Sequence, residues 1–166
     1  MISFWPLHKI KIYVLNILAF YNSILKLHTL FLYQINFMLK ILNVCISLFV
    51  SILVTNVWLF RFNKETPYRG GEAKNMIEEF AAYGLDLNTM YLIGSLKIIA
   101  SLGLIIGLLK TKISVYSSLL MAILMTGAIY FHFKISDPAI KYFPSALMLT
   151  CSVFIYFSSK KILKTN

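Results

Sequence analysis

The sequence is poor in charged residues and poorest in acidic ones. Asp and Glu number 6 among 166 residues, Lys and Arg number 16, and the charged share is 13%. A soluble domain has about 25% charged and about 45–50% apolar residues, whereas the hydrophobic share here is 59%. The composition therefore excludes an ordinary soluble domain and indicates a protein that is solvated by lipid. The length leaves room for four or five spans of about 20 residues each.

Cysteine is scarce, and the common catalytic motifs are missing. Cys45 and Cys151 each lie inside an apolar run and form no CxxC, so we interpret both as small buried hydrophobes. The sequence shows no glycine-rich phosphate loop, no HExxH, and no nucleophile with a neighbouring histidine and acid. We therefore predict no catalytic residue and no metal site. Whether the protein is an enzyme stays open at this stage.

The formal net charge of +10 comes from basic residues at the ends of apolar runs. Examples are Lys110, Lys112, Lys160, Lys161 and Lys164. This placement favours contact with anionic lipid headgroups and is typical of the signal that orients membrane spans. We therefore expect the lipid bilayer as the partner of this chain, and no nucleic-acid binding.

Residues 1–37 form an atypical N-terminal extension. Residues 13–37 are mostly apolar, but polar residues interrupt them without gathering on one helical face: Asn16, Asn22, Lys26, His28, Gln34 and Asn36. The segment is a poor amphipathic helix and a poor span, and it lacks a signal-peptide cleavage site. A cleaner pattern begins at Met38. Two interpretations stay open: a start codon assigned too far upstream, or a genuine extra helix at the interface or in the bilayer.

Residues 38–160 are predicted to hold four spans, followed by a basic tail over residues 161–166. The expected spans are residues 41–60, 87–109, 113–133 and about 142–158. The hydrophilic segment 61–86 contains a short helix over residues 72–83 that Gly84 stops. We expect this helix at the membrane surface, and the alternative is a lid over the mouth of the bundle. Short loops make consecutive spans antiparallel neighbours. The predicted fold is an all-α integral membrane four-helix bundle, with residues 1–37 as an extra hydrophobic segment if they are translated.

Lys97 lies near the middle of the second predicted span. A lysine at the bilayer centre costs about 2.5–3.5 kcal/mol on insertion scales, and such a residue usually faces the protein interior and marks function. Asn56 and Tyr130, on the first and third spans, are the candidate polar partners. The alternative is a structural lysine that snorkels toward the membrane surface. No acidic residue lies within any of the four predicted spans.

His132 is the single histidine of residues 38–160. A lone histidine at the end of a span is more often a residue of the membrane interface than a metal ligand or a haem ligand. Together with Lys97, Asn56 and Tyr130 it completes the set of candidate functional residues.

Four fragments occur in the order and spacing of a known family. FAAYGL (80–85) precedes the second span, IGSLK (93–97) lies within it, LGLIIGLL (102–109) closes it, and LLMAILMTGAIYFH (119–132) lies in the third. With them, residues 38–160 resemble the DoxX-like family of small four-helix bacterial membrane proteins. The resemblance implies a multi-pass protein of a bacterial inner membrane. Two positions depart from the family pattern, because the family often has proline at Asp86 and an acidic residue at Lys97.

Three functions follow from the residues and the resemblance. The first is an accessory or partner-binding membrane subunit with no assignable reaction and no cofactor, whose partner is another membrane protein or a peripheral redox protein. The first alternative is a membrane subunit of a quinone-linked oxidoreductase, because some members of the broader group resemble such subunits. Tyr130, His132 and Lys97 could then line a quinone slot. The second alternative is a small-solute transporter, although we see neither repeats nor broken helices.

Overall fold

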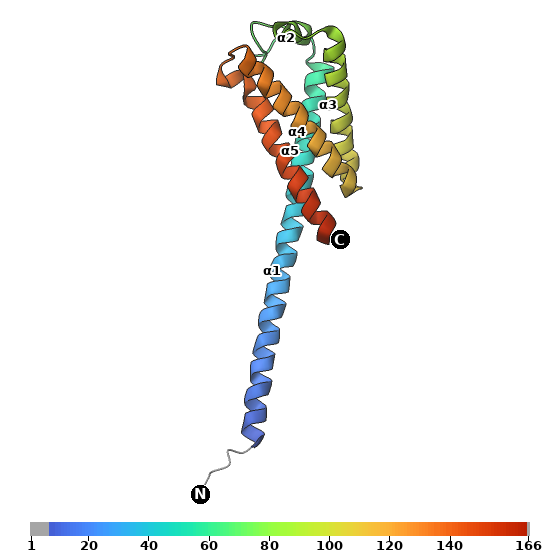
Figure 1. The fold of residues 1–166 in the computed structure, drawn as a ribbon. Helices are drawn as coiled ribbons and strands as arrows, with labels where there is room; N and C mark the ends of the chain where they lie inside the picture. Colours follow the sequence, from blue (N-terminus) through green and yellow to red (C-terminus); the bar gives the residue numbers. More distant parts are fainter. Residues whose placement is uncertain (1–6, 166) are drawn as a thin grey trace. The chain divides into compact units, whose positions relative to one another are not determined.

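The computed structural model describes residues 7–165, which form five α-helices and one π-helical turn without any strand. The elements are α1 (Leu7–Thr55), η1 (Asn56–Phe60), α2 (Met76–Ala82), α3 (Leu87–Gly107), α4 (Thr111–Lys134) and α5 (Ala139–Thr165) (Figure 1). The predicted all-α class is confirmed. Of the described residues, four helical stretches are long and apolar enough to cross a membrane: Lys11–Phe60, Leu87–Gly107, Thr111–Lys134 and Ala139–Lys164.

The chain divides into two units, Met1–Leu39 and Lys40–Asn166, and α1 contributes residues to both. In the first unit, residues 7–39 are helical, so the change of sequence pattern at Met38 does not interrupt the helix. Large apolar side chains such as Phe20 and Leu27 are exposed there. A helix with so many exposed apolar side chains is suited to a lipid environment.

We expect a variant that begins at Met38 to insert into membranes and to keep the fold of the second unit, because that unit has its own core. Its Tm should change by less than about 3 °C, which corresponds to about 1 kcal/mol for a chain of this size. The measurement is thermal unfolding of both proteins in the same lipid nanodiscs. Loss of membrane insertion would show that residues 1–37 are required, and mass spectrometry of the endogenous protein would show whether they are made.

Each apolar helix of the second unit supplies side chains to one buried core. The contributions are Val50 and Val54 from α1, Ala100 and Leu104 from α3, Met121 and Met125 from α4, and Met148 and Ile155 from α5. A second cluster of Met76, Phe80 and Met90 anchors the short helix α2 to the start of α3. α2 lies across one end of the longer helices of this unit (Figure 1).

Small and polar residues bring the helices close together in the second unit. A Cβ added to Gly107 on α3 would lie 2.7 Å from the backbone of Ser114 on α4. Asn43 on α1 donates to the Ser159 hydroxyl of α5 at 3.1 Å, so its buried amide has a partner. Hydrogen bonds of this kind join helices in lipid, where a lone polar group is costly. One expectation is wrong, because Cys45 is exposed rather than buried.

Local signals set the start of α3. Gly84 has a φ of 76°, the left-handed conformation expected of a residue that follows a helix. Asp86 is the N-cap of α3, and its carboxylate accepts hydrogen bonds from the backbone N–H and the hydroxyl of Thr89. These hydrogen bonds lower the pKa of the Asp86 carboxyl. These contacts fix the conformation of the connection from α2 into α3. They thereby help to position α2, whose residues line the cavity of the second unit.

Candidate functional site

A cavity of about 730 Å³ lies inside the second unit, among the end of α1, η1, α2, α3, α4 and α5. Such a volume is typical of sites for small organic ligands, which run from about 300 to 1,000 Å³. The lining is mostly apolar and includes the aromatic rings of Trp58, Phe80, Phe131 and Phe143. Polar side chains also contribute to the lining, among them Asn56, Arg69, Glu79, Tyr83, Lys97, His132 and Lys141.

Lys97 points its amine toward an aromatic ring. The Nζ atom lies 5.5 Å from the centroid of the Trp58 ring, within the range of a cation–π interaction. The indole fits beside α3 because position 94 is glycine, and a Cβ there would collide with the Trp58 ring. In the described part of the chain, no acidic side chain lies within 4.0 Å of this amine. Its N–H groups therefore remain available to a ligand in the cavity.

The predicted candidates are only partly brought together. Lys97, Asn56 and His132 all line the cavity. Tyr130 lies outside its lining, with a relative exposure of 62%, on a face of α4 that suits lipid. The aromatic neighbour of Lys97 is Trp58. The helical period predicts how far along α4 Tyr130 lies. It does not predict the rotation of α4 about its axis, which decides whether Tyr130 faces the cavity.

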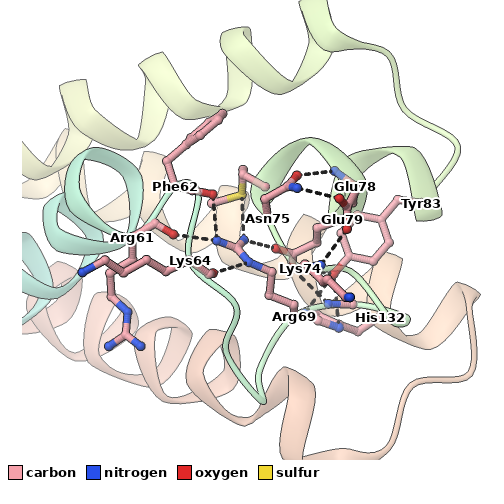
Figure 2. Close-up of polar contacts among 12 residues, drawn as sticks. Arg61, Phe62, Lys64, Arg69, Lys74, Asn75, Glu78, Glu79, Tyr83 and His132 are labelled. Atoms are coloured by element: carbon pink, nitrogen blue, oxygen red, sulfur yellow. Dashed lines mark hydrogen bonds and ion pairs between the residues drawn. The ribbon is translucent and has the colours of Figure 1, made fainter.

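Arg69 organises the loop that follows η1, as Figure 2 shows. Its guanidinium donates to the carbonyl oxygens of Lys64 at 3.1 Å, Arg61 at 2.7 Å and Phe62 at 3.0 Å. It also forms an ion pair with Glu79 on α2, with 2.6 Å between Nη1 and Oε2. The Arg69 side chain is only 5% exposed, so this loop is built around a buried cation that is fully paired.

A chain of polar contacts continues from Glu79 to the loop between α4 and α5. The Tyr83 hydroxyl lies 3.0 Å from Oε1 of Glu79, and it is almost equally far from the two ring nitrogens of His132, 3.1 Å from Nε2 and 3.2 Å from Nδ1. Nδ1 of His132 lies 2.7 Å from Oδ2 of Asp137. Oδ1 of Asp137 accepts a hydrogen bond from the backbone N–H of Gly71 at 3.0 Å and lies 3.6 Å from the Lys141 amine. We call Glu79, Tyr83, His132 and Asp137 the polar chain.

The polar chain is shielded from water. The side chains of His132 and Asp137 are each 4% exposed. Burial of the Tyr83 hydroxyl, together with the neighbouring Glu79 carboxylate, raises the pKa of this phenol far above its usual range. Tyr83 therefore carries its hydrogen at neutral pH. His132 is thus a buried, hydrogen-bonded residue rather than the interface residue that the sequence favoured.

Sequence reasoning did not identify four important residues of this site. Trp58 is interpretable as an interfacial aromatic, and Arg69, Glu79 and Asp137 as loop and surface charges. One local signal was available, because Glu79 and Tyr83 are four residues apart and so share one side of α2. The partners of Arg69 and Asp137 come from other parts of the chain, and spacing in the sequence does not indicate them.

A protein-family model described as the DoxX-like family matches residues 70–154. The matched range contains α2, α3 and α4, and with them Lys97 and the whole polar chain. No curated protein and no solved structure matches the chain.

Proposed function

Because the chain belongs to the DoxX-like family and has four helices able to cross a membrane, we propose that it is a multi-pass protein of a bacterial inner membrane that binds a quinone. The four apolar helices would form the membrane-embedded bundle. In this function the protein is a membrane subunit of a quinone-linked redox assembly, and its partner is another membrane protein or a peripheral redox protein that exchanges electrons with the bound quinone.

The observation that carries this proposal is a lysine amine beside an aromatic ring in an apolar cavity, with no acidic side chain of the described residues 7–165 within 4.0 Å of it. A quinone has a flat apolar ring, carbonyl oxygens that accept hydrogen bonds and, in its natural forms, a long apolar tail. The Lys97 amine supplies donors to a carbonyl oxygen, and the Trp58 indole supplies a surface for the ring. The apolar lining suits a molecule that arrives from the hydrocarbon of the membrane.

Trp58 provides a direct test of binding. The chain has two tryptophans, and Trp5→Phe leaves Trp58 as the single one. We expect a short-chain quinone to quench the fluorescence of this variant in lipid nanodiscs with a saturable curve. Lys97→Met should then weaken the affinity about tenfold or more, because a hydrogen bond from a charged donor contributes about 1.5–3 kcal/mol and 1.4 kcal/mol corresponds to tenfold.

Lys112→Met is the matched control, since this lysine is exposed at the start of α4 and lies outside the cavity lining. It should leave the affinity unchanged. Two results would contradict the proposal: quenching that does not saturate, or an equal quinone affinity in the Lys97→Met variant. The remaining interpretation would then be an accessory membrane subunit that binds no quinone. Quenching by a fatty acid but not by the quinone would assign the cavity to an anionic amphiphile instead.

A further inference from the structure

On one side, the cavity of the second unit reaches the surface of the protein between apolar side chains. Five apolar residues both line the cavity and are exposed: Phe49 and Ile52 on α1, Ile123 on α4, and Phe143 and Leu147 on α5. A side chain that meets both conditions lies at the edge of an opening, and Ile52 and Ile123 are the most exposed of the five, at 66% and 61%. All five belong to stretches that are long and apolar enough to cross a membrane. The opening is therefore suited to contact with hydrocarbon rather than with water.

Gly127 on α4 leaves open space in the cavity. It belongs to the lining, and a Cβ added to it would meet no atom of the described residues within 4 Å. A Cβ added to the other glycines of α3 and α4, Gly94, Gly103 and Gly107, would collide with a neighbouring residue. Glycine is unfavourable within a helix, and close packing accounts for it at these three positions. At Gly127, no atom of the described residues uses the space that the missing side chain leaves.

The open space at Gly127 lies deeper in the second unit than the position of the quinone head. Trp58 lies at the α2 end of the cavity, because its ring is 6.0 Å from that of Phe80 on α2, and His132 lies at this end as well. Gly127 and Ile123 share one side of α4, because they are four residues apart. They come five and nine residues before His132, so they lie about 7.5 and 13.5 Å deeper along the helix. The lining therefore leads from the head position past Gly127 to the opening at Ile123.

We propose that the ligand of this cavity is a long-tailed quinone, whose tail passes Gly127 and leaves into the bilayer between α1, α4 and α5. The inference rests on the proposed function for the quinone head, which lies between the Lys97 amine and the Trp58 ring. It adds the class of quinone, namely one with a flexible apolar tail such as a polyisoprenoid chain. We call the residues of this route the tail slot: Phe49, Ile52, Ile123, Gly127, Phe143 and Leu147.

The chemistry of the tail slot matches an apolar chain. None of its side chains carries a charge or a hydrogen-bonding group, so no polar side chain of the slot loses its solvent when the tail passes. The hydrocarbon outside is about as apolar as the slot, so the tail gains little free energy by entering it. The slot instead gives the tail an exit, which lets the head reach the Lys97 amine while the rest of the tail stays in the bilayer. A cavity closed on this side would exclude every quinone with a long tail.

Filling the tail slot tests the proposal. Gly127→Leu places a side chain in the open space, and Thr126→Leu is the matched control, because Thr126 is exposed and lies outside the cavity lining. Both variants carry Trp5→Phe and are titrated in nanodiscs by Trp58 fluorescence with a long-tailed quinone and with its tail-less analogue, each expressed per lipid. Gly127→Leu should lower the ratio of the long-tailed to the tail-less affinity about tenfold or more, because a tail forced against an added side chain is penalised as strongly as an overpacked core. Thr126→Leu should leave this ratio unchanged.

A stability measurement and a second variant separate blocking of the slot from misfolding. The Tm of Gly127→Leu should equal or exceed that of the Trp5→Phe parent, because leucine is favoured over glycine in a helix. Ile123→Phe narrows the opening at an exposed position and should lower the same affinity ratio. An unchanged ratio in a folded Gly127→Leu variant would overturn the tail slot while leaving quinone binding intact, and Ile123→Phe decides in the same way if Gly127→Leu does not fold. If neither quinone quenches the parent with a saturable curve, the proposed function fails, and the tail slot fails with it.

Discussion

The Arg69→Met variant should lose about 3–5 kcal/mol of unfolding free energy, the cost of removing one partner of a buried ion pair. Arg69 is almost fully buried, and its guanidinium pairs with Glu79 and with three backbone carbonyl groups. Methionine fills similar space but satisfies none of these acceptors, so the Glu79 carboxylate, which is only 13% exposed, is left without its cation. For a chain of this size the expected fall in Tm is about 10 °C.

Thermal unfolding in nanodiscs measures the effect, and Arg61→Met is the matched control. Arg61 lies in the same loop with an exposed side chain, and its hydrogen bond with Arg69 is made by its backbone carbonyl. This variant should change the Tm by about 1–2 °C at most, because surface substitutions usually cost under about 0.5 kcal/mol.

A double variant, Arg69→Met with Glu79→Gln, separates the ion pair from the carbonyl contacts. It should be more stable than the sum of the two single losses implies, because it leaves no unpaired carboxylate. Equal Tm values for Arg69→Met and Arg61→Met would show that the loop does not depend on the buried guanidinium.

The second large effect is expected from Gly107→Ala, which should lower the unfolding free energy by about 1–3 kcal/mol through overpacking. The new Cβ would lie 2.7 Å from the Cα and N atoms of Ser114. Those are backbone atoms of α4, so no side-chain rotation relieves the contact and the two helices must separate. Thermal unfolding in nanodiscs again provides the measurement.

Gly127→Ala makes the same chemical change in a neighbouring helix with the opposite expected sign. A Cβ at Gly127 meets no atom within 4 Å, and alanine is favoured over glycine in a helix by about 1 kcal/mol. This variant should therefore raise the Tm by a few degrees. A fall in Tm that is equal for the two variants would contradict close packing of α3 against α4 at Gly107.

Several features of the fold were predictable because their causes are local. A segment can span the bilayer if its run of apolar residues is long enough. The three later spans could therefore be located from length and composition. Gly84 and Asp86 act on the backbone within a few residues of themselves, and the end of α2 and the start of α3 lie where they predict. Lys97 was singled out because the cost of burying an amine in hydrocarbon belongs to the side chain itself.

The surroundings of these residues were decided only by the tertiary structure. Lys97 lies beside Trp58 because glycine at position 94 admits the indole, and the period of α3 carries no information about the chain segment that packs there. Tyr83 and His132 are 49 residues apart, and their contact depends on where α2 lies over the end of α4. Residue type and spacing determine whether a segment is more stable in lipid or in water. The partner of each buried charge depends on the rotation and approach of separate helices, which interactions across the whole second unit determine together.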